Sequence, residues 1–79
     1  MTPNSIKALL AIRGLDYESV LKRMKAKGVK SDKFELSKLI SGSLTSKRKQ
    51  EAFAAALGMK RDEVFDAEFD SVVAYRKSA

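Results

Sequence analysis

Cysteine and histidine are both missing from this chain of 79 residues. Without cysteine the fold cannot rest on disulfides, and without either residue a Cys/His zinc site is excluded. One small domain must therefore be held together by packing of its apolar side chains, which make up 44 % of the chain, aided or not by a second subunit. Lack of cysteine is typical of proteins in a reducing compartment, so we expect a cytoplasmic location.

Long apolar runs are absent as well. No stretch approaches the ~20 apolar residues that a membrane-spanning helix requires. No signal-peptide pattern opens the chain either. We therefore expect no membrane partner.

Proline and strand signals are also scarce. The single proline, Pro3, precedes the first apolar periodicity, and no sustained alternation of apolar and polar residues is present. Apolar residues instead recur at helical spacing, and Gly14, Gly28 and Gly42 stand where successive helices would end. The sequence predicts an all-α fold of five short helices.

Residues that cap helices predict where four of these helices begin. Asp16 suits the start of the second helix. Either Ser31 or Asp32 suits the third, which we expect over residues 31–41, with Glu35 completing a capping box. We expect the fourth over residues 45–57, capped by Thr45 or Ser46, and a short fifth helix from Arg61 or Asp62.

The charge of the chain is unevenly distributed. Residues 1–61 hold 14 Lys and Arg against 5 Asp and Glu, a balance of +9, whereas residues 62–79 hold 2 against 5, a balance of −3. A basic body with an acidic tail favours a polyanion as partner of the body. The alternative is that the charge serves solubility alone.

Three consecutive cations lie at the expected start of the fourth helix, where the helix dipole disfavours positive charge. This unfavourable placement indicates an anion bound nearby, and the obvious anion is a nucleic-acid phosphate. We therefore predict phosphate contacts from these cations and from the small polar residues before them: Ser41, Ser43, Thr45, Ser46, Lys47, Arg48 and Lys49. The lysine-rich run at residues 22–30 would flank this surface, or be a solvated helix face.

Four short motifs follow one another in a recognisable order. They are Arg13-Gly14-Leu15, Leu36-Ser37-Lys38-Leu39-Ile40-Ser41-Gly42, Ala56-Leu57-Gly58-Met59 and Asp62-Glu63-Val64-Phe65. In this order they resemble the lambda-repressor-like, Cro-type helix-turn-helix domains of small phage and plasmid regulators. The resemblance covers roughly residues 5–66, so we expect a DNA-binding domain at 1–66 and a helical or extended tail at 67–79.

The stretch Asp16–Ser31, which holds the second helix and the turn after it, departs from this family. It is longer by about two residues, so the turn is not the usual tight one, and it carries five basic residues: Lys22, Arg23, Lys25, Lys27 and Lys30. The angle at which the third helix is presented therefore need not be the family's.

The resemblance implies that the third helix enters the major groove and that Lys33, Phe34, Ser37 and Lys38 read base edges. The two lysines would donate to guanine, and Ser37 would donate or accept. Phe34 would contact a thymine methyl group or, alternatively, be buried in the core.

Apolar residues of the tail recur at helical spacing: Phe65, Phe69, Val72 and Val73. We expect this stripe to form the contact of a homodimer, which would match a palindromic operator. Its alternative is packing onto the same domain against Ile6 or Leu10.

The expected function is that of a sequence-specific double-stranded DNA-binding transcription regulator, a repressor in a bacterial or phage-infected cell. No nucleophile with a base, metal loop or phosphate-binding loop is visible, so we expect no enzyme, no cofactor, no metal and no small-molecule ligand. The main alternative is an antirepressor-like module that binds a regulator protein. Single-stranded RNA binding and nonspecific architectural DNA binding are further alternatives.

Overall fold

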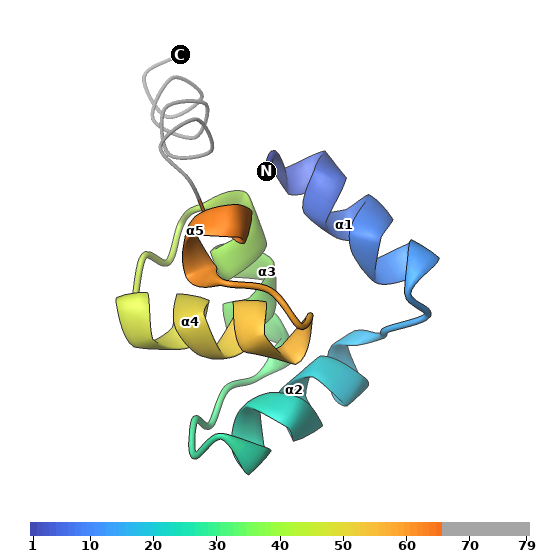
Figure 1. Ribbon diagram of the computed structural model, residues 1–79. Coiled ribbons are helices and arrows are strands. Elements are labelled where there is room, and N and C mark those ends of the chain that lie inside the picture. The colour runs from blue at the N-terminus through green and yellow to red at the C-terminus, as the bar shows by residue number, and fades with distance from the viewer. Residues whose placement is uncertain (66–79) are drawn as a thin grey trace.

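A computed structural model describes residues 1–65 of the chain, and within these residues every regular element is a helix. The helices are α1 (Pro3–Ile12), α2 (Tyr17–Ala26), α3 (Lys33–Ser41), α4 (Lys47–Ala56) and α5 (Arg61–Val64) (Figure 1). The prediction of an all-α fold is confirmed. Among residues 1–65, no helix is long and apolar enough to cross a membrane.

Side-chain caps fix the starts of the helices that matter most for the site. Asp16 Oδ1 accepts a hydrogen bond from Ser19 N at 2.8 Å, and Asp32 Oδ1 accepts one from Glu35 N at the same distance. Ser46 Oγ accepts a longer bond, 3.4 Å, from Lys49 N. Each bond satisfies an amide that a helix start would leave unpaired.

Two predicted helix starts need correction. The third helix begins at Lys33 rather than residue 31, because Asp32 is its cap. The fourth begins at Lys47, because Ser46 rather than Thr45 is the cap, and it ends at Ala56. The prediction of a capping box is wrong, because the Glu35 carboxylate accepts hydrogen bonds from Ser31 and Lys49 and not from the Asp32 amide.

The core lies between α4 and the other helices. The α4 helix packs against α2 and α5, while α3 packs against α1 and α2 (Figure 1). Phe53 and Phe65 place their ring centroids 5.8 Å apart at the centre of this core. The fully buried side chains also include Ile6, Val20, Met24, Leu36, Leu39 and Val64. Burial of their apolar area is the main stabilising contribution to a domain of this size.

The segment 27–32 connects α2 to α3. Gly28 adopts a positive φ of 82°, which glycine accepts readily, and Val29 N then bonds back to Met24 O at 3.0 Å. Val29 is buried against the core, and the next residues run outside it toward the cap of α3. The structure thus agrees with the longer connection that the sequence predicts.

Candidate nucleic-acid interface

The α3 helix has one buried face and one exposed face. Leu36, Leu39 and Ile40 are at most 1 % exposed. The four residues predicted to read bases, Lys33, Phe34, Ser37 and Lys38, are all exposed. Their spacing of i, i+1, i+4 and i+5 puts them on the same side of the helix. The structure therefore brings these four side chains together on one accessible surface.

Phe34 is the most informative member of this set, because its side chain is 80 % exposed. The alternative that Phe34 belongs to the core is therefore wrong. Single exposed apolar residues are common on proteins, yet this aromatic ring lies among two lysines and a serine on a helix with a separate, complete apolar face. The ring is free to contact a partner.

The loop between α3 and α4 holds the small polar residues that were predicted to bind phosphate. Gly42 ends α3 with a φ of 87°, a left-handed conformation that a side chain would strain. Ser41 Oγ donates to Lys38 O at 3.2 Å, so its only hydrogen is already used. Among residues 1–65 the Thr45 hydroxyl has no partner, and Ser46 only accepts, so both retain a hydrogen to donate.

The three cations at the start of α4 turn out to have different roles. Lys47 is exposed and has no ion-pair or hydrogen-bond partner for its ammonium within the described residues. Arg48 Nη2 donates to Gly28 O at 3.2 Å and so fastens the connection 27–32 to α4. Lys49 forms an ion pair with Glu35 of α3. Lys47 is thus the best placed of the three for a phosphate, whereas Arg48 and Lys49 also support the fold.

Sequence reasoning missed the network around Glu35. Its carboxylate accepts from Ser31 Oγ at 3.2 Å and from the Lys49 ammonium, so it links the connection 27–32, α3 and α4. The Ser31 and Glu35 positions are visible in the sequence, but the approach of Lys49 depends on the packing of α4. This network fixes the N-terminal turn of α3, which carries Lys33 and Phe34.

Arginines and lysines divide their roles throughout the described part of the chain. Arg13 donates to Leu57 O, and Arg23 donates to Ala56 O at 2.8 Å, so both satisfy carbonyls at the end of α4. Arg61 donates to the buried Gln50 at 2.9 Å. With Arg48 bound to Gly28 O, every arginine of residues 1–65 donates to a group within the fold. Most lysines remain free at the surface.

One residue of the predicted dimer stripe, Phe65, lies in the described part of the chain. Phe65 is 1 % exposed and packs against Phe53, so its ring belongs to the core of its own domain and cannot serve a dimer contact. This corrects the prediction for Phe65. The same-domain alternative holds for this residue, because Phe65 belongs to the buried cluster that also contains Ile6, Leu10 and Phe53. Phe69, Val72 and Val73 lie outside the described residues.

Carboxylates do not gather into a metal site in the described region. Residues 1–65 contain no group of three or more acidic side chains that could hold an ion. The features that the structure assembles are an exposed α3 face, a polar loop and free lysines. No known protein family, curated protein or solved structure matches the chain, so the interface rests on these described residues alone.

Proposed function

We propose that this protein is a sequence-specific double-stranded DNA-binding regulator that places α3 in the major groove. The observation that carries the proposal is the exposed face of α3, where Lys33, Phe34, Ser37 and Lys38 are all accessible. An α-helix fits the major groove, and residues near its start contact base edges there.

The chemistry of these four side chains suits base edges. Lysine ammonium groups donate to guanine O6 and N7, a serine hydroxyl accepts or donates, and an aromatic ring contacts the thymine methyl group. Lys47, Thr45 and Ser46 follow α3 in the chain and supply donors suited to the phosphate backbone. Support therefore comes from two kinds of contact, one that would position the helix and one that would read sequence.

Repression is the simplest mechanism that binding to DNA can provide. A bound domain excludes polymerase from an overlapping promoter without any enzymatic step. One helix reads few base pairs, so two subunits on a palindromic site would give the required specificity. We include the homodimer in this proposal, with Phe69, Val72 and Val73 as its contact.

In the test, the full chain selects binding sites from a pool of random duplexes. Each duplex is about 30 base pairs long, which is about three helical turns. The selected duplex and a scrambled one are then compared by titration. We expect at least about tenfold preference for the selected duplex and two protomers per site. The Lys33→Ala/Lys38→Ala variant should lose most of that preference, because each good base contact contributes about 1–3 kcal/mol.

Other outcomes identify the rival functions. Equal, steeply salt-dependent binding to both duplexes would indicate an architectural protein. Absence of binding to either duplex would favour the antirepressor-like module. In that case the exposed Phe34 would be the first residue to test as a protein contact.

A further inference from the structure

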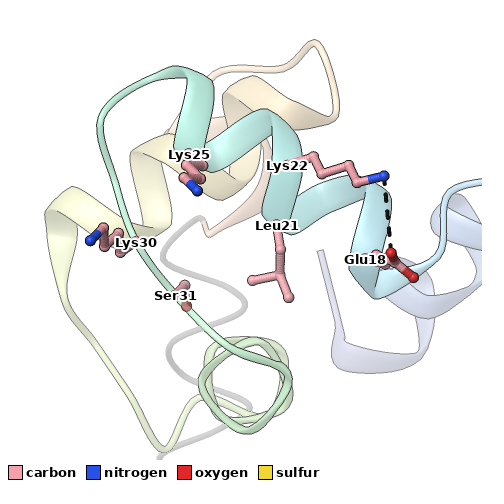
Figure 2. Close-up of a pocket in the computed structure, with 6 residues that line it drawn as sticks. All are labelled: Glu18, Leu21, Lys22, Lys25, Lys30 and Ser31. Carbon is pink, nitrogen blue, oxygen red and sulfur yellow. Dashed lines mark ion pairs between the residues drawn. The ribbon is translucent and has the colours of Figure 1, made fainter.

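A pocket between α2 and the start of α3 is not part of the surface described above. Its volume is about 320 Å³, and it is lined by Glu18, Leu21, Lys22, Lys25, Lys30 and Ser31. Figure 2 shows three lysines around it, two from α2 and Lys30 from the connection 27–32. We call this feature the α2 pocket.

The α2 pocket is suited to an anion. Three lysines and one carboxylate line it, which leaves a local balance of +2. Glu18 approaches Lys22 only to 4.0 Å, with side chains 70 % and 79 % exposed, so this pair binds weakly. Lys25 and Lys30 have no ion-pair or hydrogen-bond partner for their ammonium groups within residues 1–65. Their charge is therefore available to a ligand.

The connection 27–32 holds Lys30 in a defined place. Arg48 Nη2 bonds Gly28 O, Val29 is buried, and Ser31 bonds Glu35, so the backbone is fixed on both sides of Lys30. Lys30 also borders a second pocket, together with Ser46, Arg48 and Lys49. The connection is thus a ridge with cations on both flanks, from α2 to the start of α4.

The position of this ridge points to the DNA backbone as the ligand. Ser31 precedes Asp32, the cap of α3, so the α2 pocket adjoins the end of the helix that would point at the bases. A helix in the major groove has a phosphate strand along each wall of the groove. Resting on the DNA-binding function proposed above, we propose that Lys25 and Lys30 bind phosphates of one strand, flanking the base pairs that α3 reads.

This assignment gives the long connection a function. In place of a tight turn, the chain has a fixed basic ridge that extends the DNA contact beyond α3. Such phosphate contacts add affinity and salt dependence but carry no sequence information. They should therefore act equally on the selected and the scrambled duplex.

The experiment compares two double variants of the full chain that lose the same charge. Lys25→Gln/Lys30→Gln removes the two free ammonium groups of the α2 pocket. Lys7→Gln/Lys60→Gln is the matched control, because both lysines are exposed and lie on α1 and before α5. Binding to the selected and scrambled duplexes is titrated between about 50 and 200 mM salt, the range over which phosphate contacts are resolved.

We expect the salt slope of the pocket variant to fall by about 1.8 per bound protomer, and so by about 3.6 for two protomers on one site, because each phosphate contact contributes about 0.9. The fall should be the same on both duplexes, so the preference for the selected duplex is retained. The control variant should keep a slope close to that of the unmodified chain. Equal circular dichroism melting curves for the three proteins exclude unfolding as the cause.

Two results would overturn the inference and are distinguishable. If the pocket variant matches the control while the unmodified chain still prefers the selected duplex, the α2 pocket binds no phosphate and the proposed function stands. If the unmodified chain binds no duplex, the proposed function fails and the inference fails with it.

Discussion

Glu35 of α3 and Lys49 of α4 form an ion pair in which each side chain is 27 % exposed. The pair joins the proposed DNA-reading helix to the helix that follows it. Because the pair is partly buried, breaking it should destabilise the fold more than breaking a surface ion pair would. The charge that remains after one partner is removed would be poorly solvated. The network around Glu35 therefore sets the orientation of α3.

Replacing either member should destabilise the domain. We expect Glu35→Gln and Lys49→Gln each to lower the free energy of unfolding by about 1–2 kcal/mol. The double variant should lose less than the sum, with a coupling of at least about 0.5 kcal/mol. Urea unfolding of the four proteins measures this coupling, and strictly additive losses would show that the two side chains do not interact.

Phe34 should contribute little to stability despite its size. Because the ring is 80 % exposed, we expect Phe34→Ser to change the free energy of unfolding by less than about 0.5 kcal/mol. Ile40→Val is the matched control on the buried face of the same helix and should cost about 0.5–1.5 kcal/mol. A larger loss for Phe34→Ser than for the control would mean that the ring packs within the fold. Affinity for the selected duplex should fall in Phe34→Ser.

Arg23 should stabilise the end of α4. Its bond to Ala56 O satisfies a carbonyl that the helix leaves unpaired, and its charge complements the negative end of the helix dipole. We expect Arg23→Gln to cost about 1–2 kcal/mol. In thermal unfolding, the melting temperature should fall by about 4–8 °C for each kcal/mol lost in a domain of this size.

The neighbouring Lys22→Gln serves as control for Arg23→Gln. It removes the same charge one residue away, where only the weak 4.0 Å pair with Glu18 is lost. Its melting temperature should stay within about 2 °C of the unmodified chain, as expected for an exposed pair. Equal losses in the two variants would assign the effect to net charge rather than to the bond at Ala56.

Asp16 should make stability depend on pH in the acid range. The Ser19 amide and then the Ser19 hydroxyl hydrogen-bond the carboxylate, which lowers the pKa of Asp16 below its ordinary value of 3.8. Because the pKa of Asp16 is lower in the folded state, its ionised carboxylate stabilises the fold. This contribution to the free energy of unfolding is complete when the pH is above the ordinary pKa and is lost as the pH falls through the folded-state pKa.

The measurement is urea unfolding from pH 7 to pH 2 for the unmodified chain and Asp16→Asn. Asparagine keeps a capping oxygen but cannot ionise, so the stability difference between the two proteins should shrink below pH 3.8. An unchanged difference over that range would mean that Asp16 titrates alike in the folded and unfolded states. An NMR titration of the Asp16 carboxyl carbon checks the direction of its pKa directly.

Local chemistry explains which parts of the fold could be predicted. Asp16 and Asp32 were recognised as caps because capping depends on a side chain and an amide three residues away. Gly14, Gly28 and Gly42 all adopt positive φ, as their predicted positions at helix ends require. The set on α3 came from the resemblance to helix-turn-helix domains, and helical periodicity supports it only for Lys33 and Lys38, which lie opposite the apolar stripe.

Contacts between distant segments were beyond such reasoning. The bonds from Arg13 to Leu57 and from Arg23 to Ala56 span 44 and 33 residues, so they depend on how whole helices pack. The burial of Phe65 has the same origin, since helical spacing cannot say whether a stripe meets its own domain or a second copy. Phe34 was ambiguous because it lies off the stripe of apolar residues in α3.

The separation of arginines from lysines has a chemical consequence. Within residues 1–65 the guanidinium groups donate to groups of the fold, whereas the ammonium groups, apart from that of Lys49, carry most of the charge that faces outward. Reagents or enzymes that acylate amines leave guanidinium groups untouched. Acetylation of surface lysines such as Lys25, Lys30 and Lys47 would therefore neutralise the outer charge while the arginine bonds inside the domain persist. Amine acylation that spares Lys49, whose ammonium pairs with Glu35, is accordingly a chemical means of removing attraction to polyanions while the fold is kept.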